Sequence, residues 1–239
     1  MEVSFPLALT NRQLFECSLG RRKARNVVNP TRVVLKLFDW RYATDLREEY
    51  QDPPWTPERE TAYLECVNSG RAKGHLHALI EAGEYSQDEE EEEEDIVPNE
   101  VHLYGWCANM YQSEIAVYKR MRAYQDSQIP RLMNSVSVTV DQIKAALGSS
   151  EAEFVTIRGI LIEYIDSFIL SDISPMNAPK GYWQFIVDKA IENVHLMSDN
   201  FVLNKDVSHR NVITYRVVTI DFALCHCDTQ TSPSLTGTC

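Results

Sequence analysis

The sequence lacks an excess of positive charge. It holds 23 Lys and Arg residues against 35 Asp and Glu residues, so its formal net charge is −12. Nucleic-acid-binding proteins usually carry a basic excess, and this balance argues against that function. The run from Asp88 to Asp95 alone supplies eight of the acids. These charges repel one another and cannot be buried, so the run predicts a disordered loop.

Long apolar runs are also absent. No stretch approaches the roughly 18 apolar residues that a membrane-spanning helix needs. The first residues, Met1 to Pro6, do not place a basic segment before an apolar one, as a secretory signal would. We therefore expect an intracellular protein, cytoplasmic or nuclear, with neither a membrane nor a nucleic acid among its partners.

The six cysteines follow no repeated spacing of the kind that indicates a disulfide framework or a zinc site. The segment from Cys225 to Asp228 groups several metal-ligating residue types, but no second ligand pair lies at a useful spacing. Free thiols in a reducing compartment are the preferred interpretation.

Glycine is scarce where a phosphate-binding loop would need it, because Gly20 is the only glycine before Lys36. The basic segment from Gly20 to Arg25 occupies that region. Its cations either contact phosphates or, in the simpler alternative, form a solvated turn.

The composition, 44% hydrophobic and 24% charged, is that of a globular protein. A chain of 239 residues accommodates one large domain or two lobes that share a cleft. Apolar runs predict strands at residues 33–38, 135–140, 154–158 and 160–165. With the helices below, they indicate an α+β fold.

Lys36 interrupts the first of these apolar runs. Burying an ammonium group costs several kcal/mol unless it is paired, so we expect an anionic partner for Lys36. The alternative is an edge strand on which Lys36 faces water.

Helical spacing marks three further segments. Thr56 followed by Pro57 indicates a helix start, with threonine as the N-cap. Apolar residues at helical spacing predict a second helix over 104–125, with Glu114 at the rim of its buried face. Glu114 is the natural partner for Lys36, although it could also be a surface glutamate. A third helix is expected over 183–197, with an apolar stripe that includes Val187 and Ile191.

The stretch from Phe201 to Ala223 contains two acids and an amide at a specific spacing. Asn211 follows Asp206 by five positions, and Asp221 follows Asn211 by ten, after a short β-branched run. This arrangement is typical of sites that hold Mg²⁺ and an attacking hydroxyl around a nucleotide γ-phosphate. The alternative is a β-hairpin whose turn residues Asp206, Asn211 and Asp221 are polar because they face water.

The stretch resembles the catalytic loop and the metal-binding Asp-Phe-Gly motif of the protein-kinase-like fold. Asn-Lys-Asp-Val with Arg-Asn-Val is most similar to divergent kinase-like proteins common in fungi. Three residues depart from the kinase pattern, because Asn204 and Lys205 replace His-Arg and Ala223 replaces glycine. None of the three removes a metal ligand.

The resemblance implies a two-lobed fold and a role for each landmark. Lys36 would anchor phosphates and be held by Glu114, and Asp206 would orient the acceptor hydroxyl or accept its proton. Asn211 and Asp221 would carry Mg²⁺. Adenine would contact the backbone of Glu163 and Ile165, with Ile162 behind it. A buried strand explains these last three residues equally well without a ligand.

In domain terms, the resemblance implies an N-lobe over 1–165, with an insertion at about 41–103 that includes the acidic loop 88–95. A partial C-lobe would cover 166–228, and 229–239 would be a disordered tail. The expected cofactors are ATP and Mg²⁺, and the expected partners are a nucleotide and a protein substrate.

Three functions follow from this reading. The chain is either a phosphotransferase acting on a hydroxyl, with protein serine or threonine favoured, or a truncated pseudokinase that acts as an interaction protein. The missing glycine loop and lower helices favour the pseudokinase, and the intact metal residues favour the enzyme. An aminoglycoside-type small-molecule phosphotransferase is a weaker alternative, since it shares the Asp-to-Asn spacing.

Overall fold

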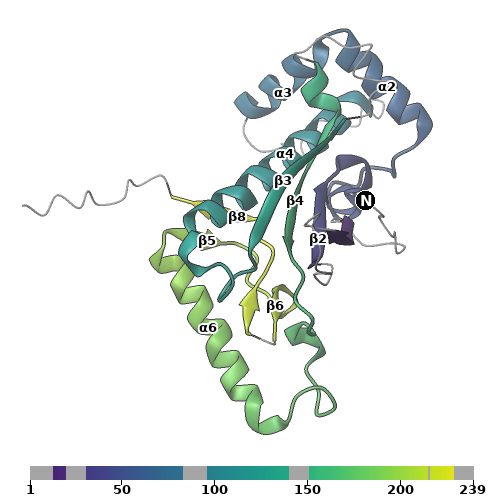
Figure 1. The fold of residues 1–239 in the computed structure, drawn as a ribbon. Coiled ribbons are helices and arrows are strands. Elements are labelled where there is room, and N and C mark those ends of the chain that lie inside the picture. The colour runs from purple at the N-terminus through teal and green to yellow at the C-terminus, as the bar shows by residue number, and fades with distance from the viewer. Residues whose placement is uncertain (1–12, 20–30, 83–95, 140–150, 215, 229–239) are drawn as a thin grey trace, which may run out of the picture. The chain divides into compact units, whose positions relative to one another are not determined.

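The computed structural model describes residues 13–19, 31–82, 96–139, 151–214 and 216–228 (Figure 1). The chain divides into two units, described separately below: residues 1–111 with 132–164, and residues 112–131 with 165–239. Helices accompany small antiparallel sheets, so the protein is α+β. The basic segment at 20–25, the acidic run at 88–95 and the tail at 229–239 lie outside the described residues.

The first unit contains a four-stranded antiparallel sheet. Its strands are β1 (Gln13–Leu19), β2 (Thr31–Phe38), β3 (Leu132–Thr139) and β4 (Thr156–Glu163), in the order β1-β2-β4-β3. The strand expected at 33–38 is confirmed as β2, and most of the one expected at 135–140 lies in β3. Because β2 pairs on both sides, Lys36 stands opposite Leu14 and Ile160. Lys36 is therefore not on an edge strand, and it is only 3% exposed.

The expectation of two strands over 154–165 is wrong. One strand, β4, runs through Gly159, and residues Ala152–Val155 before it form a 3-10 turn. A Cβ at position 159 would lie 2.7 Å from both the Leu37 side chain and the Lys36 carbonyl oxygen. Glycine here permits a close approach of neighbouring strands and does not mark a turn.

Short helices follow the sheet's second strand. They are α1 (Thr44–Glu49), α2 (Pro57–Asn68) and α3 (Arg71–Ala82), after a 3-10 turn at Trp40–Tyr42. The predicted start of α2 is confirmed, because the Thr56 side chain accepts a hydrogen bond from the Arg59 amide and Pro57 occupies the first turn. Tyr63, Cys66 and Val67 form its buried face.

Helix α4 (Ile96–Arg120) is longer at its start and shorter at its end than the predicted 104–125. A 3-10 turn over Arg122–Tyr124 follows it. In the first unit, Tyr111 packs edge-on against Phe38, with ring centroids 5.7 Å apart, so this part of α4 lies on the sheet. The division between the units falls within α4, after Tyr111.

A buried cluster of four charged residues joins α1, α2 and α4 in the first unit. Glu100 accepts hydrogen bonds from Arg47 at 2.8 and 3.0 Å and from Arg59 at 3.0 Å. Asp52 accepts from Arg59 at 2.9 Å and also pairs with Arg47. All four are under 9% exposed, so each charge depends on the others for stabilisation.

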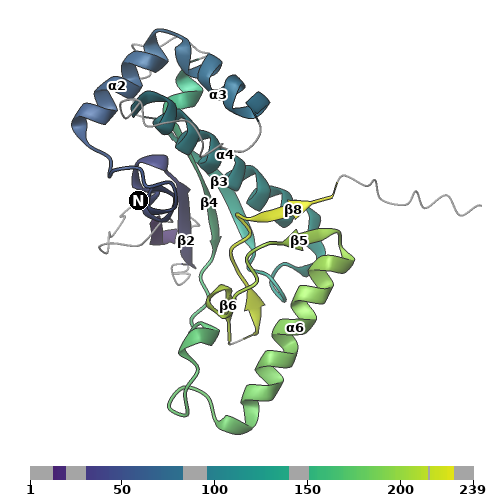
Figure 2. The ribbon, with the colours of Figure 1, turned by 180° about the vertical axis from the view of Figure 1, so that it is seen from behind.

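The second unit is organised around α6 (Trp183–Asp199), as Figure 2 shows from behind. Two small ribbons accompany it: β5 (Val202–Asn204) with β8 (Cys225–Cys227), and β6 (Val212–Ile213) with β7 (Val218–Thr219). Ile186 of α6 packs in a core with Ala178, Val212 and Val217. Asn193 adds a hydrogen bond of 2.6 Å to the Val217 carbonyl. Helix α6 thus holds the β6–β7 ribbon in place.

The predicted helix over 183–197 is confirmed, but its apolar stripe is wider than its buried face. Val187 is 39% exposed and Ile191 is 50% exposed, contrary to expectation. The core contacts only the side of α6 that carries Ile186, Asn193 and Met197. Within the described residues, no helix combines the length and apolar character that crossing a membrane requires.

Candidate functional site

The β6–β7 ribbon sets the positions of Asn211 and Asp221. Val212 pairs with Thr219 and Ile213 with Val218. This register places Asn211 opposite Ile220, and the Ile220 amide donates to the Asn211 carbonyl oxygen at 2.9 Å. Asp221 is the next residue after Ile220. The two predicted metal ligands are therefore brought to the same end of one ribbon.

Asp206 is bound directly to Asn211. The Asn211 side-chain amide donates to the Asp206 carboxylate and to the Asp206 carbonyl oxygen, both at 3.0 Å. The Asp206 amide donates to the Asn204 side chain at 2.8 Å, and Arg210 donates to the carboxylate at 3.3 Å. These bonds fix the loop between β5 and β6. Asn211 is only 5% exposed, so the alternative of a hairpin with three water-facing turn residues is wrong.

Asp221 has an unusual backbone conformation. Its φ of +68° lies in the left-handed region, which costs most non-glycine residues free energy and which aspartate tolerates better than most. The next residue, Phe222, is fully buried and meets Tyr118 of α4 edge-on, with ring centroids 5.4 Å apart. Burial of Phe222 thus anchors the chain immediately after Asp221. Strain of this kind is concentrated at functional sites, which makes Asp221 a candidate.

Glu114 lies on α4 in the second unit and is fully buried, so its predicted place at the rim of a buried face is wrong. A buried carboxylate is costly unless it is compensated, which suits a residue with a charged partner. Lys36 belongs to the first unit, where its ammonium lies 5.2 Å from the centre of the Phe38 ring. The pairing of Lys36 with Glu114 stays a prediction.

The residues expected to contact adenine lie at the end of β4 and just after it. Ile162 is buried in β4, and Glu163 is its last residue, opposite Val33 of β2. Ile165 begins the second segment of the second unit and is also buried. Their proposed role in nucleotide binding stays a prediction.

The oxygen atoms near Asn211 suit a hard cation. Because the Asn211 amide nitrogen binds Asp206, its side-chain oxygen points elsewhere and keeps its lone pairs. Asp221 supplies a carboxylate, one oxygen of which accepts a long hydrogen bond of 3.4 Å from the Ala223 amide. Mg²⁺ typically takes one or two protein carboxylates and completes its shell with phosphate oxygens and water. Asn211 and Asp221 fit that pattern, whereas the described residues hold no group of three or more His, Cys, Asp or Glu side chains able to bind a metal alone.

The segment from Cys225 to Asp228 does not gather into a metal site. Cys225, His226 and Cys227 lie along β8, where successive side chains point to opposite faces. Cys225 is buried and His226 is exposed. Burial also raises the pKa of the Cys227 thiol, which disfavours a reactive thiolate.

Two contacts of Asp206 were not anticipated from the sequence. In the sequence Asn204 is a departure from the kinase pattern, and in the structure its side-chain oxygen accepts a hydrogen bond from the Asp206 amide. Arg210 lies four positions after Asp206, at the 3-10 turn His209–Asn211 that ends the loop, and this spacing is the sequence signal for their contact.

Neither a comparison with models of known protein families nor one with curated proteins finds a match for the chain.

Proposed function

We propose that this chain is a protein-kinase-like phosphotransferase that uses ATP and Mg²⁺ to phosphorylate a hydroxyl, that of a protein serine or threonine. The observation that carries the proposal is the double attachment of Asn211. Its side chain holds Asp206, and its main chain bonds to the residue before Asp221. One buried amide thereby ties together the three polar residues that phosphoryl transfer requires.

Each residue has a distinct part in this chemistry. Asp206, held by Asn211 and Arg210, orients the acceptor hydroxyl and accepts its proton. Asn211 and Asp221 provide the oxygen ligands for Mg²⁺. When bound, that ion neutralises phosphate charge, and the remaining task of the protein is to position the reactants.

The order of the sheet supports the roles proposed for the first unit. Lys36 pairs directly with Ile160, so the strand bearing the proposed phosphate-binding lysine adjoins the strand that ends at Glu163. The phosphate contact and the adenine contact would then come from neighbouring strands. Burial of Lys36 also keeps its ammonium away from bulk water, where a phosphate contact would be weaker.

A phosphotransfer assay with Asp206→Asn tests the proposal. We expect turnover to fall at least about 100-fold, the typical minimum for loss of a catalytic base, with Mg²⁺-ATP affinity retained. Asp199→Asn, at the exposed end of α6, is the matched control and should retain full turnover. Equal turnover in Asp206→Asn and wild type would contradict the assigned role.

A second candidate is a pseudokinase that binds a partner protein. It is favoured by the exposed apolar side chains of the second unit, among them Phe185 and Ile191 of α6 and Leu203 of β5. Under this alternative, the wild type shows no transfer to any hydroxyl, and removing the Asp221 carboxylate changes neither binding nor function.

A further inference from the structure

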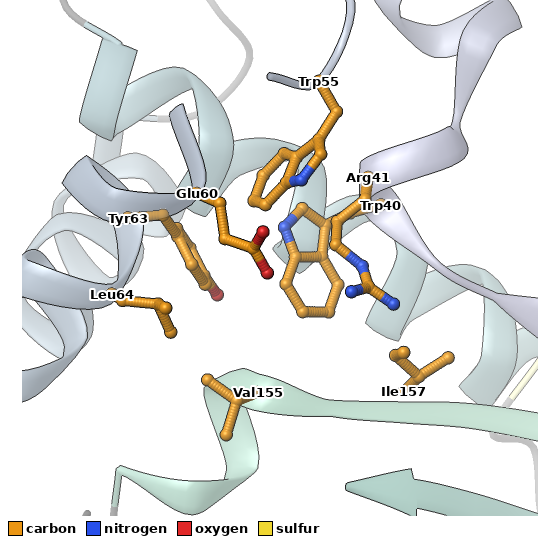
Figure 3. Close-up of a pocket in the computed structure, with 8 residues that line it drawn as sticks. All are labelled: Trp40, Arg41, Trp55, Glu60, Tyr63, Leu64, Val155 and Ile157. Atoms are coloured by element: carbon orange, nitrogen blue, oxygen red, sulfur yellow. The ribbon is translucent and has the colours of Figure 1, made fainter. Parts of the chain in front are cut away.

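The first unit contains a pocket separate from the residues proposed for phosphoryl transfer (Figure 3). The space free of atoms is about 300 Å³, including the part open to solvent. The 3-10 turn after β2, the segment before α2, α2 itself and the start of β4 each contribute to its wall. The lining residues are Trp40, Arg41, Trp55, Glu60, Tyr63, Leu64, Val155 and Ile157.

Three aromatic rings form one side of this pocket. Trp40 and Trp55 lie with ring centroids 6.3 Å apart and planes at 88°, and Trp40 and Tyr63 lie 5.4 Å apart at 46°. Tyr63 is held in place because its hydroxyl donates to the Phe154 carbonyl at 2.7 Å. A ring face attracts cations, and the guanidinium carbon of Arg41 already lies 5.8 Å from the centre of the Trp40 ring.

Glu60 places a carboxylate beside these rings. Figure 3 shows its side chain extending from α2 towards Trp40. It is half-buried, and no described residue donates a hydrogen bond to its carboxylate or forms an ion pair with it within 4.0 Å. Partial burial removes water from the carboxylate, so a cation that binds beside it would stabilise its charge.

Two other groups at the pocket could favour an anion instead. Arg41 is positively charged, but Asp39 accepts hydrogen bonds from its guanidinium at 2.9 and 2.7 Å and neutralises it. The Trp40 indole N–H is buried, and no described residue accepts from it. This single donor carries no positive charge with which to hold an anion. Arg41 interacts electrostatically with both Asp39 and Glu60, and these three residues together carry a net charge of about −1.

We propose that this pocket binds a small quaternary ammonium compound of the choline type. The cation would lie against the rings of Trp40, Trp55 and Tyr63, with Glu60 as its counter-ion. The apolar side chains of Leu64, Val155 and Ile157 suit its methyl groups. A primary ammonium is more strongly hydrated and loses more on entering such a lining. This site is independent of the proposed phosphotransferase, so failure of either leaves the other standing.

Titration of the full chain with choline, followed by NMR of the tryptophan indole N–H signals, tests the proposal. The chain has four tryptophans. Signals of Trp40 and Trp55 should shift with saturation, while those of Trp106 and Trp183, which do not line the pocket, should not. The matched probe is the uncharged isostere of choline in which carbon replaces nitrogen. We expect choline to bind at least about fivefold more tightly than this isostere, as a cation–π contact predicts.

Variants of α2 sharpen the test. Glu60→Gln should weaken choline binding at least about fivefold, and Glu60→Lys should abolish it. Glu65→Gln, an exposed position on the same helix, is the matched control and should bind as the wild type does. Equal affinity for choline and its isostere would show an apolar pocket without charge selection and overturn the proposal, as would shifts confined to Trp106 and Trp183. Tighter binding of a trimethyllysine peptide than of choline would overturn the assignment to a small molecule.

Discussion

The two units use charged residues in opposite ways. In the first unit, Arg47, Arg59, Asp52 and Glu100 are buried and bind one another, so their charges are satisfied within the fold. In the second unit, the Asp206 and Asp221 carboxylates remain half-buried beside a strained backbone. A buried network of paired charges stabilises a fold, whereas half-buried carboxylates lie closer to solvent, where a ligand could reach them. The difference supports a structural role for the first set and agrees with the chemical role proposed for the second.

The largest effect is expected from opening the buried cluster. Glu100→Ala removes one of the two carboxylates that bind the buried Arg47 and Arg59, which should lower the free energy of unfolding by about 3–5 kcal/mol. Urea denaturation measures this loss. Glu65→Gln, at an exposed position of α2, is the control and should change stability by less than about 0.5 kcal/mol. A loss below about 1 kcal/mol for Glu100→Ala would remove the structural role assigned to the cluster.

A smaller effect is expected in the sheet of the same unit. Gly159→Ala introduces a Cβ that would lie 2.7 Å from the Lys36 carbonyl oxygen. The backbone must shift to accommodate it, at a cost of about 1–3 kcal/mol. Thermal unfolding measures the cost, with Gly181→Ala as control because a Cβ there meets no atom within 4 Å. An unchanged melting temperature for Gly159→Ala would show that the strands can move apart freely.

In the second unit, removing a charge should not destabilise the fold. Asp221→Gly takes away a side chain from a residue at φ +68°, where glycine is unstrained. We expect stability to stay the same or rise by up to about 1 kcal/mol, while phosphotransfer is lost. Chemical denaturation and the transfer assay, run side by side, separate the two effects. A loss of stability comparable with that of Glu100→Ala would contradict the contrast between the units.

The smallest effect is a pH dependence in the first unit. Burial lowers the pKa of His102, whose Nε2 accepts a hydrogen bond of 2.6 Å from the Trp106 indole. The folded state therefore binds fewer protons than the unfolded state. Stability should hold above the unfolded pKa of about 6.5 and fall as the pH drops from there towards the lowered folded value. Unfolding at about pH 7.5 and about pH 5.5 should show this loss in wild type and a smaller one in His102→Gln. An equal loss in both would assign the pH dependence to other groups.

The sequence predicted those features that depend on local pattern. Periodicity located β2 and α6, and the Thr56-Pro57 pair marked the start of α2. The spacing of Asp206, Asn211 and Asp221 is visible in the sequence in the same way, and their function stays a prediction. Each of these features lies within a short segment of sequence, where the residue types and their spacing are enough to predict it.

Other features depend on contacts between distant residues. Arg47 and Glu100 are 53 positions apart, so no local pattern could reveal their cluster. The continuity of β4 through Gly159 depends on the neighbouring strand, and the exposure of Val187 and Ile191 depends on how far the core extends along α6. Helical spacing predicts the direction in which the Glu114 side chain points from its helix. It does not predict how deeply other residues pack around that side chain, so the expected position at the rim of the buried face is wrong.

The central claim, that Asp221 completes a Mg²⁺-dependent nucleotide site, is tested most directly by ATP binding. Thermal unfolding of wild type and Asp221→Asn would be recorded with ATP alone and with ATP plus Mg²⁺, since a ligand that binds only the folded state raises the melting temperature. Asparagine keeps the shape of aspartate and tolerates positive φ, so the fold should be preserved. We predict a Mg²⁺-dependent rise in the wild type that is absent in Asp221→Asn. A wild type without this rise, or a variant that retains it in full, would contradict the account.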